Sequence, residues 1–341
     1  CNRETPDSPI GGLESINGIK ALRNTVNVGK NKAIEAPKRQ IGAKHGTRGW
    51  HEPAPSRLRV KAVYAQLLGA VVRAILVMIV ISTPSLLIPG DNPEATQLVT
   101  LLAVFGAAFT FSEYASTNPG LIEFRNAPPF NRIRALSIFV TLFVLSVLVS
   151  SSGHPTTLSI IVEATGLVLA RALDFPYSPL NLLNHLIPAG SPITDRIAVL
   201  SMGGLALFIG LITLSVFAIL VRVFDWPKGR TAFNVWVNLP TFDPTAGKDV
   251  VTRLIRDARV NILLGIVLPF LLPVLASISA DHLGLPILAS RQTLVWTITL
   301  WTFFPVSLIM RGMAMNRVAD MIEIRRKQMI AAVDADGMVP V

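Results

Sequence analysis

The sequence predicts an all-α fold: a polytopic bundle of about six transmembrane helices, with a further re-entrant or interfacial helical segment on its outer face. Two observations lead to this prediction. Of the 341 residues, 51% are hydrophobic and 15% are charged, whereas soluble domains carry about 25% charged residues. Six stretches are also apolar enough, and long enough, to cross a hydrocarbon core of about 30 Å, which needs about 20 helical residues.

Each of these stretches is predicted to be a helix, because a backbone that crosses lipid must satisfy its own hydrogen bonds. The apolar excess is mostly Leu, Ile, Val and Ala, and only 7% of the residues are aromatic. This composition favours helices over the strands of a membrane barrel, which carry aromatic girdles. The predicted spans are residues 62–88, 97–115, 135–152, 197–223, 260–280 and 293–312.

The distribution of basic residues predicts the orientation. The segment up to Lys61, the loops 116–134 and 222–259, and the segment from Arg311 together hold 27 of the 31 Lys and Arg residues. The opposite loops hold only three. Because Lys and Arg collect on the cytoplasmic side of a membrane, we expect both termini in the cytoplasm, with the chain in a cell membrane of the bacterial inner-membrane type. The same rule accounts for the net charge of +10, so the lipid bilayer is an expected partner and nucleic acid is not.

One apolar segment does not fit a simple count of spans. Thr157–Leu173 is mostly apolar but carries Glu163 and Arg171. If it crossed the membrane, one of the two basic termini would lie outside. We therefore expect it to be a re-entrant or surface-lying helix within an outer cap, residues 153–196, although the sequence leaves a seventh crossing open.

The segments that flank the spans are basic. Residues 1–59 lack apolar periodicity and are expected to be a disordered cytoplasmic tail, followed by the transmembrane domain, 60–312. Residues 313–341 are expected to form a cytoplasmic C-terminal helix and tail. Residues 248–259 have an amphipathic pattern and are expected to lie on the inner leaflet, with Trp226 and Trp236 nearby at headgroup level.

Ionisable residues within a membrane are costly and usually functional. Four such residues are candidate functional positions: Arg73, Glu113, Glu163 and Arg171. Arg73 shares a helix face with Gln66 and Arg59, so it either extends toward the cytoplasmic interface or contacts a buried partner or ligand. Glu113 ends the second span and is expected to pair with a loop arginine such as Arg125. Glu163 and Arg171 are expected to act within the outer cap.

Small residues mark a further candidate surface. Gly203, Ala206 and Gly210 lie on one face of the fourth span and predict close helix packing, within the bundle or with a partner. Pro269 and Pro273 in the fifth span, like a proline in the sixth, predict local kinks.

No catalytic constellation is recognisable. The one cysteine, Cys1, excludes an internal disulfide framework and a thiolate metal site. No histidine lies inside a predicted span, and phosphate-binding and hydrolase motifs are missing. We therefore expect no cofactor, no metal site and no enzyme activity.

Two classes of function are favoured, and a membrane enzyme with its site in the outer cap stays open as a third. The first is a non-catalytic accessory, assembly or scaffold component of a membrane complex, which binds other membrane subunits. The second is a transporter of a small solute or ion, which would need a cavity that reaches the middle of the membrane and is lined by Arg73 and the fifth and sixth spans.

Overall fold

The computed structural model describes most of the chain beyond the predicted tail. Residues 1–55 of that tail lie outside the described part, as do Trp236 and most of its loop. The described residues are 56–88, 93–116, 120–150, 155–187, 190–227, 238–240, 242, 247, 249–283 and 290–335.

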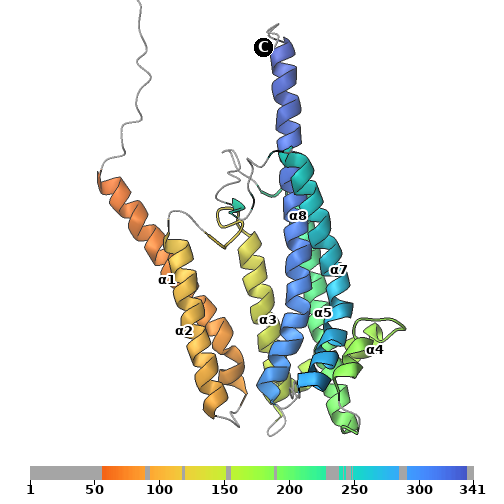
Figure 1. The fold of residues 1–341 in the computed structure, drawn as a ribbon. Helices are drawn as coiled ribbons and strands as arrows, with labels where there is room; N and C mark the ends of the chain where they lie inside the picture. Colours follow the sequence, from red (N-terminus) through yellow and green to blue (C-terminus); the bar gives the residue numbers. More distant parts are fainter. Residues whose placement is uncertain are drawn as a thin grey trace, which may run out of the picture. The chain divides into compact units, whose positions relative to one another are not determined.

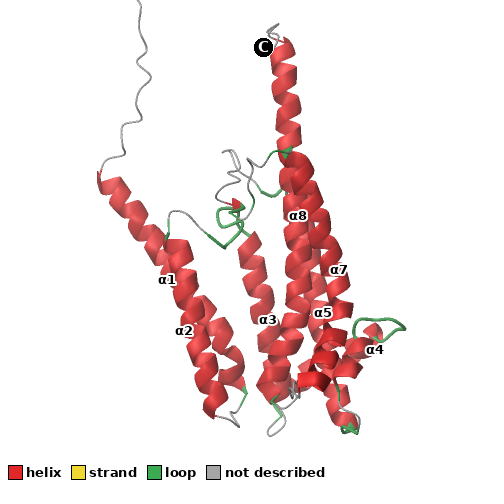
Figure 2. Cartoon of the chain, viewed as in Figure 1, coloured by secondary structure: helices red, strands yellow, loops and turns green. Residues whose placement is uncertain are grey.

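The described residues form helices and loops and contain no strand (Figure 2). Within these residues, six helices are long and apolar enough to cross a membrane, which confirms the predicted fold class. They are α1 (Ser56–Leu87), α2 (Pro93–Ala115), α3 (Phe130–Ser150), α5 (Ile193–Arg222), α7 (Val250–Leu283) and α8 (Arg291–Ala335) (Figure 1). Two shorter elements lie between α3 and α5 in the chain: α4 (Thr157–Leu173) and the 3-10 helix η1 (Asn181–Leu186).

The segment that complicated the count of spans is a separate helix, α4. It has 17 residues, fewer than the about 20 that a crossing needs. Thr156 and Ser159 close its first turn with a reciprocal capping box. α4 packs on α5 and α3, and a Cβ added to Gly204 of α5 would lie 2.9 Å from the backbone nitrogen of Ala170. Glycine thus lets the two backbones approach closely.

The longest helices, α7 and α8, form an antiparallel pair in which a glycine of each helix faces the backbone of the other. A Cβ at Gly265 would lie 2.7 Å from the carbonyl oxygen of Pro305, and one at Gly312 would lie 2.7 Å from that of Ala258. Any larger residue would push the helices apart. With 45 residues, α8 is about 68 Å long, so it must extend well beyond a bilayer core.

The helices α1 and α2 run side by side as a hairpin (Figure 1). Of the described elements, α2 packs only on α1, whereas α1 also contacts α3 and, slightly, α8. The small residues Ala103 and Ala107 of α2 are buried, and Gly106 faces α1 side chains. The larger side chains Leu101 and Phe105 are exposed. The hairpin is therefore attached to the other helices through α1, and α2 leaves an apolar face uncovered.

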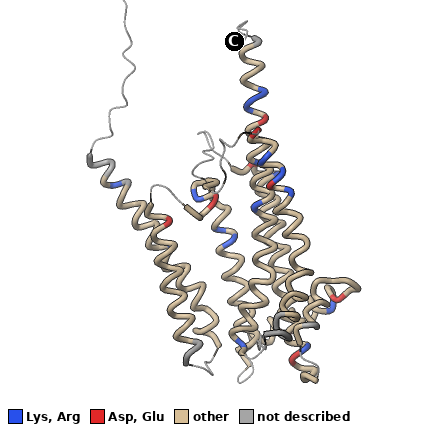
Figure 3. Tube along the Cα trace, viewed as in Figure 1, with Lys and Arg blue, Asp and Glu red and all other residues tan. Residues whose placement is uncertain are grey.

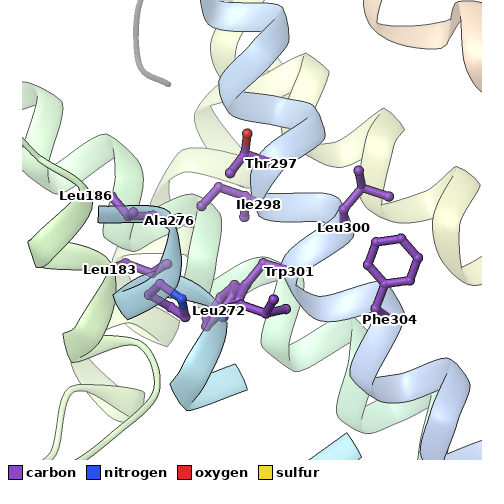
Figure 4. A pocket seen from close by; sticks show the side chains of 10 residues that line it. Leu183, Leu186, Leu272, Ala276, Thr297, Ile298, Leu300, Trp301 and Phe304 are labelled. Atoms are coloured by element: carbon purple, nitrogen blue, oxygen red, sulfur yellow. The ribbon is translucent and has the colours of Figure 1, made fainter. Parts of the chain in front are cut away.

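Prolines leave backbone carbonyls without their usual helical donors. Pro273 cannot donate a hydrogen bond to the carbonyl of Pro269, four residues earlier. The indole Nε1–H of Trp301 on α8 donates to that oxygen at 2.8 Å. Trp301 also lines a small apolar cavity of about 260 Å³ with Leu183 of η1 and Leu272 of α7 (Figure 4). A side chain of α8 thereby satisfies the polar group that a proline of α7 leaves free.

At one end of the bundle α2 ends, while α3 and α7 begin; we call it the basic end. Its core is an aromatic cluster of Phe124, Phe130, Phe217 and Trp226. Trp226, which we expected at headgroup level, is enclosed by the protein: it is 4% exposed, and its Nε1–H donates to the carbonyl of Pro128 at 3.0 Å. The amphipathic character of a tryptophan is evident from the sequence, but the side chains that surround it in the fold are not.

The amphipathic segment before the fifth span is the first part of α7, not a separate helix on the membrane surface. Its apolar residues Val251, Leu254 and Ala258 are buried in the core of the basic end. The expectation of a surface helix is wrong because an apolar stripe packs equally well on lipid or on a neighbouring helix. Asp249 caps this end of α7 by accepting from the N–H of Thr252.

Asp249 also connects α7 to the distal part of α8. The guanidinium of Arg326 donates to Oδ1 of Asp249 at 2.6 Å. This hydrogen bond, together with that from the Thr252 N–H, lowers the pKa of the exposed Asp249 carboxyl. The ionised carboxylate is thus the form that this contact favours, and the contact weakens only when the pH falls to the lowered pKa.

We predict that Trp301→Phe lowers the stability of the bundle by about 1 kcal/mol, since it leaves the Pro269 carbonyl without a donor. Pro273→Ala restores a backbone N–H at the position that normally serves this carbonyl. In that background Trp301→Phe should therefore cost less. Unfolding by SDS titration in mixed micelles, applied to the full double-mutant cycle, measures the difference. An equal cost in both backgrounds would show that the hydrogen bond is irrelevant.

Candidate functional site

The C-terminus of α2 is held by two side chains that satisfy its last carbonyl groups. A helix end leaves four carbonyls without intrahelical donors. Nε2 of Gln66 on α1 donates to the carbonyls of Tyr114 and Ala115, at 3.3 and 3.2 Å. Nη1 of Arg125 donates to those of Glu113 and Ser116, at 2.6 and 2.9 Å. The hairpin and the following loop therefore fix this helix end together.

The carboxylate of Glu113 organises the loop that follows. It accepts hydrogen bonds from three successive backbone N–H groups, those of Gly120, Leu121 and Ile122, at 3.1 to 3.2 Å. Such charge-assisted bonds are stronger than neutral ones. Glu113 thus holds the backbone of residues 120–122 in place, directly before Glu123.

Glu123 forms a bidentate ion pair with Arg311 of α8. Arg311 donates from Nε to Oε2 at 2.6 Å and from Nη2 to Oε1 at 2.8 Å. Its Nη1 donates to Oδ1 of Asn261 on α7 at 3.0 Å. The side chain of Glu123 is 11% exposed and that of Arg311 is 28% exposed. The pair therefore joins the α2–α3 loop to α7 and α8 in a largely buried setting.

A cavity of about 480 Å³ lies beside this pair. Its polar lining comes from Thr110, Tyr114, Glu123, Asn131, Arg134, Ser307 and Arg311. The volume lies within the about 300–1,000 Å³ of small-molecule sites. Asn131 is held in place, since its Nδ2 donates to the backbone carbonyl of Glu123 at 2.7 Å.

The cavity carries an excess positive charge. Arg311 is neutralised by Glu123, whereas Arg134 makes no ion pair within the described part of the chain. The guanidinium of Arg134 donates from Nε to Oγ of Ser307 at 3.1 Å and lies 5.5 Å from the ring centre of Phe130. Figure 3 shows basic residues gathered at this end of the bundle. The arrangement suits binding of an anion.

Arg73 and Glu113, two of the predicted positions, lie near the cavity but do not line it. Nη1 of Arg73 donates to the carbonyl of Gly69 in its own helix at 2.7 Å, and its guanidinium lies 4.6 Å from the ring centre of Tyr114. Arg73 therefore extends back toward the basic end. Glu113 does not form the expected ion pair with Arg125, because the carboxylate binds backbone N–H groups and the guanidinium binds carbonyls.

The other predicted positions lie elsewhere. Glu163 and Arg171 are exposed on α4 and line neither of the two cavities described above. Gly203 faces Leu183 of η1, where a Cβ would lie 2.5 Å from the leucine side chain. Ala206 is fully buried, and a Cβ at Gly210 would lie 2.9 Å from Val306 of α8. These small residues contact other parts of the same bundle.

The sequence analysis did not single out the residues that form the cavity. Glu123, Asn131 and Arg134 belong to a Pro- and Asn-rich stretch that predicts a loop, and Arg311 seemed to be one flanking charge among many. Glu123 and Arg311 are 188 residues apart, so no local spacing relates them. One signal was present: Glu123 is the one acidic residue in the basic loop 116–134.

The described residues of this site can bind an anion, but they include no cluster of side chains that could hold a metal ion. No group of three or more His, Cys, Asp or Glu side chains comes together in the part of the chain that the structure describes. A comparison of the chain with known protein families, curated proteins and solved structures finds no match.

We predict that Glu123→Gln and Arg311→Met each lower the stability by about 2 kcal/mol, because each leaves a largely buried charge without its partner. The double variant should cost less than the sum, with a coupling of about 1 kcal/mol. SDS titration in mixed micelles provides the four unfolding free energies. Glu323→Gln, which removes an exposed pair with Lys327, is the control and should change the stability by less than about 0.5 kcal/mol. Additive losses would contradict a direct coupling.

Proposed function

We propose that this membrane-spanning helical protein is a non-catalytic accessory, assembly or scaffold component of a membrane complex, and that its α1–α2 hairpin binds transmembrane helices of another subunit. The observation that carries this proposal is that, among the described helices, α2 packs on α1 alone. α2 presents large apolar side chains away from α1, including Leu98, Leu101, Leu102, Val104 and Phe105. A second membrane protein can pack on this face without a change in the rest of the bundle.

The packing of the remaining helices supports the same proposal. The transporter alternative requires a cavity lined by Arg73 and by the fifth and sixth spans. Those two spans are parts of α7 and α8, and the small apolar cavity that both of them line does not include Arg73, which bonds to its own helix. A binding role for the hairpin instead uses the exposed apolar side chains of α2.

The proposed location is a bacterial inner membrane with the basic end in the cytoplasm. Support comes from the distribution of Lys and Arg, because the basic end carries most of the charges along α3, α7 and α8 (Figure 3).

The function is tested by purification of the tagged protein in a mild detergent, with identification of the membrane proteins that remain bound. We expect a specific partner to be recovered with the wild type and lost with the variant Leu101→Ala/Phe105→Ala. The matched control is Phe208→Ala/Leu211→Ala, which truncates the same pair of residue types on the exposed face of α5 and should retain the partner. Size-exclusion chromatography verifies that each variant is folded. A wild-type protein that purifies without a partner, or a partner that all variants retain, would refute the proposal.

The orientation predicts which positions a membrane-impermeant maleimide can reach. In a Cys1→Ser background, Tyr177→Cys tests the end that carries α4, since Tyr177 is 92% exposed. Ile330→Cys, on the exposed end of α8, tests the opposite end. We expect the label to reach position 177 in intact cells whose outer membrane has been permeabilised, and position 330 only after lysis. The reverse pattern would overturn the orientation.

A further inference from the structure

The lining of the cavity at the basic end changes along the helix axes, from polar side chains at one end to apolar side chains at the other. Arg311, Arg134 and Tyr114 lie at the basic end, whereas Phe304 and Phe109 lie further into the bundle. Phe304 precedes Arg311 by seven residues on α8, which corresponds to about 10 Å along the helix. The lining therefore changes from charged to apolar over a distance comparable with half of one membrane leaflet.

The cavity is open toward the side of the bundle. α1 contacts both α3 and α8, but α2 contacts neither of them. Val77 of α1, Phe109 of α2 and Phe304 of α8 all line the cavity. Because α2 and α8 make no contact with each other, we infer that the cavity opens between them. The side chains of Phe109 and Phe304 are exposed there. Because α2 and α8 are long and apolar enough to cross a membrane, we expect this opening to face lipid acyl chains.

The lining of the cavity holds two guanidinium groups, those of Arg134 and Arg311, and one carboxylate, that of Glu123, so its net charge is positive. Burying an unpaired guanidinium away from water is costly unless an anion accompanies it. Nε of Arg134 binds Ser307, and no carboxylate of a described residue forms an ion pair with it. Glu123, the acidic residue of the lining, has both oxygens on Arg311. The polar part of the cavity is thus suited to one anionic group close to Arg134.

From these observations we infer that the cavity binds the anionic phosphodiester headgroup of a membrane lipid. The phosphate lies beside Arg134, within reach of Asn131 and Ser307, and the first carbons of the acyl chains lie along Phe109, Phe304 and Leu308. Guanidinium groups bind phosphate with strong charge-assisted hydrogen bonds. The lateral opening allows the lipid to enter from its own leaflet without leaving the bilayer. A free phosphate shares the headgroup chemistry but does not use the apolar part of the cavity.

Native mass spectrometry of the detergent-purified full chain tests this inference with dioleoyl phosphatidylglycerol, an anionic lipid, and dioleoyl phosphatidylcholine, a zwitterionic one. We expect the wild type to retain one phosphatidylglycerol with clear preference. Arg134→Gln should weaken this binding by about tenfold, the loss expected for charged hydrogen bonds. The control is Arg132→Gln, which removes the same charge from an exposed position two residues away that does not line the cavity, and it should bind like the wild type.

A second variant keeps the inference testable if Arg134→Gln does not fold. Ala135→Trp fills the cavity from an exposed position without any change of charge, and it should also lose the bound lipid. Inorganic phosphate and glycerol 3-phosphate, each added at millimolar concentration, distinguish the two sources of the anion. Equal phosphatidylglycerol binding by the wild type and both cavity variants would overturn the inference, and so would binding of the soluble phosphates without preference for the anionic lipid.

Discussion

Backbone groups that a membrane leaves without water must find partners within the protein, and the C-terminus of α2 shows how much structure this constraint determines here. Gln66 and Arg125 supply the missing donors for its last carbonyls. In the same turn Glu113 accepts the N–H groups of the next loop. The loop is thereby fixed in a position from which Glu123 meets Arg311. One helix end thus sets the geometry of the contact between the loop and α8.

The same constraint explains why α7 and α8 form the tightest contact in the bundle. The carbonyl that Pro273 leaves free is satisfied by Trp301, which requires the two helices to stay in one register. Gly265 and Gly312 permit the backbones to approach closely enough for that hydrogen bond. Hydrophobicity alone does not favour helix contact over lipid contact inside a membrane. Packing of small residues and a specific polar contact therefore supply what the hydrophobic effect supplies in water.

The sequence predicted the features that depend on composition and local pattern. The six apolar helices and the short helix α4 follow from length, apolarity and charge, and the extension of α8 follows from its continued apolar periodicity. The cavity could not be predicted this way, because Glu123 and Arg311 meet only through the arrangement of three helices. The burial of Trp226 and the packing of the first turns of α7 were missed for a related reason. An amphipathic pattern shows that a face will be covered but not what covers it.

Arg73 and Arg134 show why an arginine near a membrane boundary is hard to interpret from sequence. Arg73 lies deeper in its apolar stretch, yet it bonds to its own helix and stacks on Tyr114. Arg134 seemed to be an ordinary flanking charge, yet it forms no ion pair among the described residues and lines a cavity. The cost of a charge depends on its partners as much as on its depth. The two proposals meet at α2: because α2 packs on no described helix but α1, the same arrangement would leave it available to another subunit and would give a lipid access to Arg134. A partner subunit that packed against α2 would then cover the opening of the cavity and enclose the lipid in the interface.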